Sequence, residues 1–150
     1  MTADELGITG IALQAALDFE AAFPNETFTS GTRDLAEQAH AMATNVMANR
    51  QWILLTYIAS DASEACQMAV DKSDAETVDD MASLLLGVLS QFSADQLKHL
   101  SAHLSRQAFD VKPSTNMNAL AWLRARAMAV GGRFLDIEGG LTRWHWQAYA

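Results

Sequence analysis

The sequence predicts an α+β fold that is mostly helical, with a small antiparallel sheet assembled late in the chain. Two observations lead to this prediction. Over most of the region up to residue 100, apolar residues recur at steps of three and four, which is the period of a helix buried on one face. After residue 106, short alternating runs separated by glycines are typical of strands. The whole chain, residues 1–150, is predicted to be a single domain with a helical insertion at about residues 45–95.

Length, charge and cysteine content limit the possible classes of protein. The 150 residues suffice to bury a core, and half of them are hydrophobic, which argues against disorder. A formal net charge of −8 argues against nucleic-acid binding and gives no attraction to an anionic membrane. Cys66 is the only cysteine, so an internal disulfide is excluded and a reducing compartment is favoured.

No targeting or membrane-spanning segment is predicted. The acidic start Met1-Thr2-Ala3-Asp4-Glu5 lacks the basic charge and the unbroken apolar run of a secretory signal. No window approaches the apolar length that crosses a bilayer. We therefore expect a protein that is made in the cytoplasm without a signal peptide and is not inserted into a membrane.

The first part of the chain is predicted to contain two helices around one extended segment. Residues 8–23 have helical periodicity and end at Pro24-Asn25. Residues 26–29 are β-prone, and a turn at residues 30–32 follows them. Asp34 is placed to cap a long helix over residues 35–58, because its side chain can accept an unpaired N–H of the first turn.

Shorter helices are predicted in the middle of the chain. Residues 61–70 have helical periodicity, and Cys66 is expected to be a small buried residue within them. Ser73 with Glu76, and Ser93 with Gln96, match the capping box that starts a helix. Helices are therefore predicted to follow both serines, through Leu89 and Leu100.

The last third is predicted to supply most of the sheet. Residues 107–111 are extended in character and are followed by a turn at Pro113. Asn116 or Asn118 can cap a helix that Gly131-Gly132 ends. Residues 133–137 and 143–149 alternate like two strands, with Gly139-Gly140 between them.

Three potential metal ligands lie in this last third. His103 precedes the extended segment, Asp110 lies within it, and His145 lies in the final predicted strand. Two imidazoles and a carboxylate with one position open form the ligand set of a catalytic zinc, whereas a structural site normally needs four protein ligands. Taken singly, His103 and Asp110 fit a hydrogen-bonded helix-end histidine and an ordinary strand-end carboxylate. Together with His145, they favour a Zn²⁺ site.

The order of these motifs resembles a known family. Ser101-Ala102-His103 is followed by Ala108-Phe109-Asp110 and then by Trp144-His145, while Ser30-Gly31-Thr32-Arg33 stands well upstream, followed by Gln38. This pattern is similar to that of the D-alanyl-D-alanine metallopeptidases, whose wider group includes lysostaphin, the Hedgehog fold and several bacteriophage endolysins. The resemblance covers residues 28–38, 101–112 and 134–147, and the helical middle matches no pattern of the family.

The resemblance implies a Hedgehog/DD-peptidase-like sheet carrying zinc on His103, Asp110 and His145. It also implies that Arg33 reaches into the cleft, holds the peptide carbonyl and stabilises the oxyanion, where negative charge develops. A carboxylate near the last histidine would act as general base toward the attacking water.

The sequence departs from the family pattern at two positions. Arg106 stands where the family usually has glycine. Thr142, which cannot act as a base, stands where the family usually has the catalytic carboxylate. Glu138 is therefore the first candidate for the general base, and Asp136 is the second.

The function implied by the resemblance is that of a bacteriolytic, endolysin-like zinc metallopeptidase. It would hydrolyse a peptidoglycan stem peptide, at an L-Ala–D-Glu bond in preference to a bond involving D-Ala, as compact members without a signal do. It would act on the cell wall after release by a holin or by cell lysis. The alternative is a catalytically lapsed, metal-stabilised interaction protein on the same fold, suggested by Thr142 and the acidic helical middle. A third hypothesis is an acidic helical protein without metal.

Overall fold

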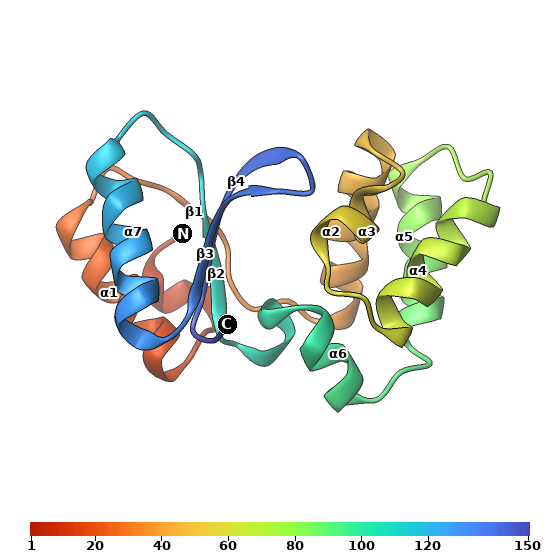
Figure 1. The fold of residues 1–150 in the computed structure, drawn as a ribbon, viewed down its shortest axis with the longest axis horizontal. Coiled ribbons are helices and arrows are strands. Elements are labelled where there is room, and N and C mark those ends of the chain that lie inside the picture. The colour runs from red at the N-terminus through yellow and green to blue at the C-terminus, as the bar shows by residue number, and fades with distance from the viewer. The chain divides into compact units, whose positions relative to one another are not determined.

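The structure, a computed structural model, describes all 150 residues and contains seven α-helices and one four-stranded antiparallel sheet (Figure 1). The predicted α+β class is thereby confirmed. The chain divides into two compact units, one formed by Met1–Thr32 with Ser105–Ala150 and the other by Arg33–Leu104. That a single domain carries a helical insertion at about residues 45–95 stays a prediction.

The first unit is built around the sheet, in which all neighbouring strands are antiparallel and the strand order is β1-β2-β4-β3. The strands are β1 (Phe28–Ser30), β2 (Ala108–Val111), β3 (Arg133–Glu138) and β4 (Leu141–Gln147). Gly139 and Gly140 join β3 to β4 and both have positive φ, as a two-residue hairpin turn requires. The late strands agree with the predicted ones, whereas Ser30, predicted to start a turn, belongs to the edge strand β1.

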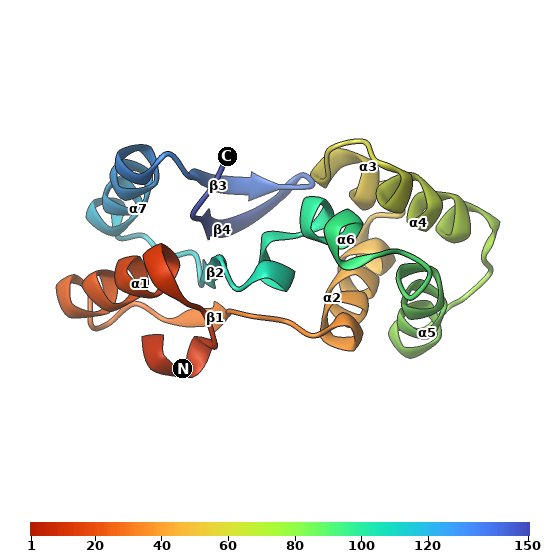
Figure 2. The ribbon, with the colours of Figure 1, turned by 90° about the horizontal axis from the view of Figure 1, so that it is seen from below.

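Two helices of the first unit pack on one side of this sheet (Figures 1 and 2). They are α1 (Gly10–Ala22), which follows the short 3₁₀ helix η1 (Ala3–Leu6), and α7 (Met117–Val130). The side chain of Asn116 caps α7 by accepting the backbone N–H groups of Asn118 and Ala119, so Asn116 is the cap among the two predicted candidates. Gly131, with φ of 72°, ends the helix as predicted.

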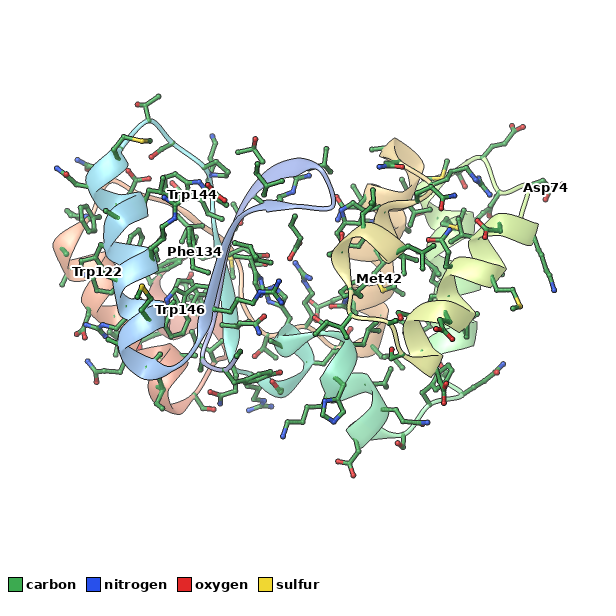
Figure 3. All side chains as sticks on the ribbon, viewed as in Figure 1. Met42, Asp74, Trp122, Phe134, Trp144 and Trp146 are labelled. Atoms are coloured by element: carbon green, nitrogen blue, oxygen red, sulfur yellow. The ribbon has the colours of Figure 1, made fainter.

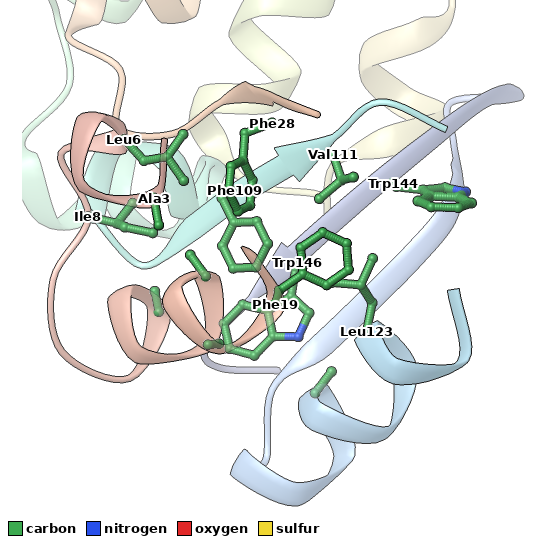
Figure 4. Packing of buried hydrophobic residues seen from close by; sticks show 14 of the residues in the cluster. Ala3, Leu6, Ile8, Phe19, Phe28, Phe109, Val111, Leu123, Trp144 and Trp146 are labelled. Atoms are coloured by element: carbon green, nitrogen blue, oxygen red, sulfur yellow. The ribbon is translucent and has the colours of Figure 1, made fainter. Parts of the chain in front are cut away.

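Aromatic side chains form the core between these helices and the sheet (Figures 3 and 4). Phe109 of β2 stacks on Trp146 of β4 with ring centroids 5.1 Å apart, and both side chains are fully buried. Phe19 of α1 and Trp144 of β4 belong to the same core. Successive residues of a strand point to opposite faces, so the residues between these aromatics face away from the core. Asp110 and His145 are two such residues.

The second unit is helical, and its core is formed by apolar side chains such as Met42, Ile53 and Leu85 (Figure 3). Its helices are α2 (Leu35–Ala48), α3 (Trp52–Thr56), α4 (Asp61–Lys72), α5 (Val78–Leu89) and α6 (Ala94–Leu100). Asp34 caps α2 and Ser93 caps α6, each within a capping box, as predicted. No helix of the chain has both the length and the apolar character needed to cross a membrane.

The structure corrects two sequence-based predictions about helices. The predicted helix over residues 35–58 is interrupted after Ala48, where the Asn49 side chain accepts the backbone N–H of Gln51 and so competes with helical hydrogen bonding. Ser73 does not start a helix. It ends α4, and Thr77 caps α5 instead by accepting the N–H of Asp80.

The backbone around Gly31 is packed too closely for any side chain. A Cβ atom at this position would lie 2.2 Å from the carbonyl oxygen of Leu6, which itself accepts the N–H of Thr32. We expect Gly31→Ala to lower the free energy of unfolding by about 1–3 kcal/mol, the usual cost of forced overpacking. Urea denaturation followed by tryptophan fluorescence measures this change.

Gly87→Ala is the matched control for that variant. Gly87 lies inside α5, and a Cβ atom there would meet nothing within 4 Å. Alanine is favoured over glycine within a helix, so this variant should be as stable as the wild type or slightly more stable. Equal stability of Gly31→Ala and wild type would contradict the close approach of Gly31 to Leu6.

Candidate metal centre

Three segments that are far apart in the sequence bring together the three predicted ligands. His103 lies in the short 3₁₀ helix η2 (Ala102–Ser105), Asp110 in β2 and His145 in β4. One potential ligand atom from each side chain lies within 4.8 Å of the others. Both histidines are buried, with relative exposures of 3% and 5%, and Asp110 is partly buried. The three side chains therefore form a group that is able to hold a metal ion.

Strand pairing places Asp110 beside His145. The two residues are direct partners in the antiparallel pairing of β2 with β4. Their side chains therefore stand next to each other on the face of the sheet that is turned away from the aromatic core. The Nδ1 atom of His145 lies 2.9 Å from the Oδ1 atom of Asp110.

A backbone contact holds the segment that carries His103. The carbonyl oxygen of His103 accepts the N–H of Arg33 at 3.3 Å. The same turn is closed by the N–H of Leu104, which donates to the carbonyl oxygen of Ser101. His103 is thus held on a tight turn shortly before β2.

The surroundings of His145 favour its protonated form when no metal is bound. Burial lowers its pKa, but the hydrogen bond to Asp110, the charges of Asp110 and Glu138 and the hydrogen bond to Gln147 together raise the pKa above its usual value. Metal binding requires a ring nitrogen without a proton. An ion at this site would therefore replace a proton that Asp110 now stabilises.

Two side chains to which the sequence analysis assigned no role at the site contact the ligands. The hydroxyl of Ser30 donates to Oδ2 of Asp110 at 2.6 Å, and Nε2 of His145 lies 2.8 Å from Oε1 of Gln147. Gln147 could have been found from the sequence, because residues two apart on a strand share a face. Ser30 belongs to the upstream motif Ser30-Gly31-Thr32-Arg33, but its contact with Asp110 depends on how β1 pairs with β2, which the motif alone does not give.

The donor set suits a transition-metal ion of the zinc type. Imidazole nitrogens favour zinc, copper, iron or nickel over the hard cations calcium and magnesium, which prefer sites made of oxygen ligands. Three protein ligands leave a fourth tetrahedral position open, as in catalytic zinc sites. The residues present therefore fit a zinc ion.

The predicted catalytic residues differ in their surroundings. Nη1 of Arg33 donates to Oε1 of the buried Gln38 on α2 in a long hydrogen bond of 3.4 Å. Glu138 is close enough for its charge to raise the pKa of His145, whereas Asp136 forms an ion pair of 2.6 Å with Arg124 of α7. Thr142 is exposed. Of the two candidates for the general base, Glu138 is therefore the one whose charge acts on His145.

The remaining cysteine and histidines lie elsewhere. Cys66 is fully buried within α4, and burial raises the pKa of its thiol to about 12, so it remains protonated and is a poor nucleophile or ligand. This agrees with its predicted role as a buried apolar residue. His40 and His99 are exposed on α2 and α6.

Comparison with known proteins found no relative that bears on this site. No family model, curated protein or solved structure matches the chain. The chemistry of the site is therefore inferred from its own side chains.

Proposed function

We propose that the chain is a zinc-dependent peptidase that cleaves stem peptides of bacterial peptidoglycan, of the D-alanyl-D-alanine metallopeptidase kind. The convergence of His103, Asp110 and His145, separated by up to 42 positions in the sequence, is the observation that carries the proposal. Asp110 and the buried His145 lie side by side on one face of the sheet, and the buried His103 joins them from the 3₁₀ helix η2. The motif order that predicted the group in advance adds support.

Zinc would supply a Lewis acid that polarises a peptide carbonyl and acidifies water. Asp110 and the two histidines would hold the ion, and three protein ligands would leave room for water or substrate. Glu138 accepts the proton of the attacking water and passes it to the leaving amine, so that water adds to the carbonyl carbon as the C–N bond breaks. Arg33 offers the positive charge that the developing oxyanion needs.

The substrate in this proposal is the L-Ala–D-Glu bond of the stem peptide, in preference to bonds that involve D-Ala. The bacteriolytic, endolysin-like setting implies that the protein reaches the cell wall after release from the cytoplasm. The negative net charge gives no general attraction to the anionic polymers of the wall. Recognition would therefore depend on the peptide at the metal site.

The experiment is digestion of purified sacculi with zinc-loaded protein. New free amino groups should appear with zinc and should be absent after treatment with a chelator. Mass spectrometry of the released fragments identifies the bond that was cut. Zinc-loaded protein that releases no new amine would rule out the peptidase.

A second candidate function is a metal-stabilised binding protein on the same fold, without turnover. The exposed Thr142, at the position where the resemblance expects the general base, favours it. In this case zinc raises the unfolding temperature, and peptidoglycan fragments bind without being cut. Fragment binding by calorimetry, next to the amine assay, separates the two functions.

A further inference from the structure

We propose that Gln147 is a positioning residue of the metal centre, which fixes the proton of His145 on Nε2 and thereby presents Nδ1 to the metal ion. The inference rests on the zinc site of the proposed function and goes beyond it, since neither the ligand set nor the motifs include Gln147. The hydrogen bonds that carry it, among Ser30, Asp110, His145, Gln147 and Tyr149, all lie within the first unit.

The orientation of the Gln147 side chain is determined by its two contacts. Its Nε2 atom donates to the carbonyl oxygen of Tyr149 at 2.7 Å. That bond uses the nitrogen end of the amide, and so the oxygen end faces the ring of His145, with 2.8 Å between Oε1 and Nε2. The reversed amide would set its NH₂ group against the ring and its oxygen against another carbonyl oxygen.

The tautomer of His145 follows from this orientation. An amide oxygen only accepts hydrogen bonds, so Nε2 of His145 must carry a hydrogen. When the ring loses one proton to bind a metal, the proton on Nε2 is retained and the lone pair appears on Nδ1. Nδ1 is the nitrogen that faces Asp110.

The distance between Nδ1 and Asp110 suits two ligands of one ion. Donors at 2.0–2.2 Å from a tetrahedral zinc lie roughly 3.3–3.6 Å apart. The observed 2.9 Å between Nδ1 of His145 and Oδ1 of Asp110 therefore has to open by only about half an ångström. Nε2 points instead at Gln147, so it is not available to the ion.

Asp110 is held in a corresponding way. The hydroxyl of Ser30 donates to Oδ2, while Oδ1 faces His145. His145 is thus held through Nε2 and Asp110 through Oδ2, which leaves Nδ1 and Oδ1 to bind a metal ion. Such supporting hydrogen bonds fix ligand orientation, and their loss typically lowers metal affinity 10–100-fold.

Zinc affinity of the full chain, measured by competition with a chromophoric chelator at one neutral pH, tests the proposal. Gln147→Leu removes the acceptor at similar size, and we expect it to weaken zinc binding about 10–100-fold. Gln147→Glu keeps an acceptor and should bind zinc no more weakly than the wild type. The control is Gln14→Leu, at an exposed position of α1, which should leave affinity unchanged.

A second measurement does not depend on any variant. The ¹⁵N chemical shifts of His145 in the zinc-loaded wild type should show a protonated Nε2 and a metal-bound Nδ1. Zinc on Nε2, or wild-type affinity in a folded Gln147→Leu protein, overturns the proposal. If Gln147→Leu does not fold, the proposal is tested by the ¹⁵N shifts of His145 and by the zinc affinity of Gln147→Glu.

The outcomes separate this inference from the peptidase itself. A wild type that binds zinc in a Gln147-dependent way but releases no amine from sacculi leaves the positioning role intact and removes the enzyme. If the wild type hydrolyses stem peptides and Gln147→Leu binds zinc as tightly as the wild type, the enzyme stands and the positioning role of Gln147 is removed. A wild type that binds no zinc removes both.

Discussion

Replacing His145 by alanine is expected to lower the affinity of the chain for zinc by about two to three orders of magnitude. Structural zinc sites with four ligands bind with about 10–16 kcal/mol, which is roughly 2.5–4 kcal/mol for each ligand. Each 1.4 kcal/mol corresponds to a factor of ten in affinity. Chelator competition measures the loss directly. Zinc at about 100 times the wild-type dissociation constant should also stabilise the wild type by about 2.7 kcal/mol and the variant far less.

Two further variants make this result specific. Asp110→Asn keeps the shape of the side chain and removes its negative charge, so it should also weaken zinc binding. His40→Ala removes an exposed histidine of α2 and should bind zinc like the wild type. Circular dichroism of each metal-free variant checks that it is folded, because His145→Ala also removes the hydrogen-bonding partner of Asp110. If folded His145→Ala binds zinc with wild-type affinity, the ion lies elsewhere in the chain.

Parts of the fold that depend on local chemistry were predictable from the sequence. Asp34, Ser93 and Asn116 cap helices through side-chain contacts within three residues, which a sequence pattern can record, although Ser73 matches such a pattern and ends α4 instead. The break after Ala48 also has a local cause, because the Asn49 side chain accepts the N–H of Gln51, but the apolar periodicity runs through these residues and hides it. The contacts of the Arg50 guanidinium with the carbonyl oxygens of Val70 and Ser73, which lie 20 and 23 residues further along the chain, could not be predicted from the sequence.

The candidate site was predictable to a similar degree. The grouping of Asp110 with His145 requires only that two late strands pair with each other. Because side chains alternate along a strand, both residues then lie on the face of the sheet away from the buried Phe109 and Trp146. The support from Ser30 depends on an irregular pairing of β1 with β2, which no periodicity reveals. The sequence ranked Glu138 before Asp136 as the general base, and the ion pair of Asp136 with Arg124 could not be predicted from motif spacing.

Replacing Glu138 by alanine is expected to reduce amine release from sacculi by about 10²–10⁴-fold, the usual contribution of a general acid–base group. Zinc affinity should stay close to that of the wild type, because Glu138 acts on His145 through its charge and is not one of the three grouped ligands. The fold should also be retained, since Glu138 is the last residue of β3 and is only partly buried. Initial rates of amine release at saturating zinc provide the measurement.

Asp136→Ala is the matched control, since it removes a carboxylate from the same strand two residues earlier. Its partner Arg124 is half exposed, so breaking this ion pair should cost at most about 1 kcal/mol. The rate of amine release should therefore stay near that of the wild type. A large loss of activity in Asp136→Ala with full activity in Glu138→Ala would reverse the assignment of the base. Full activity in both variants would mean that hydrolysis needs neither carboxylate, and the proton would then have to be accepted by a group outside β3.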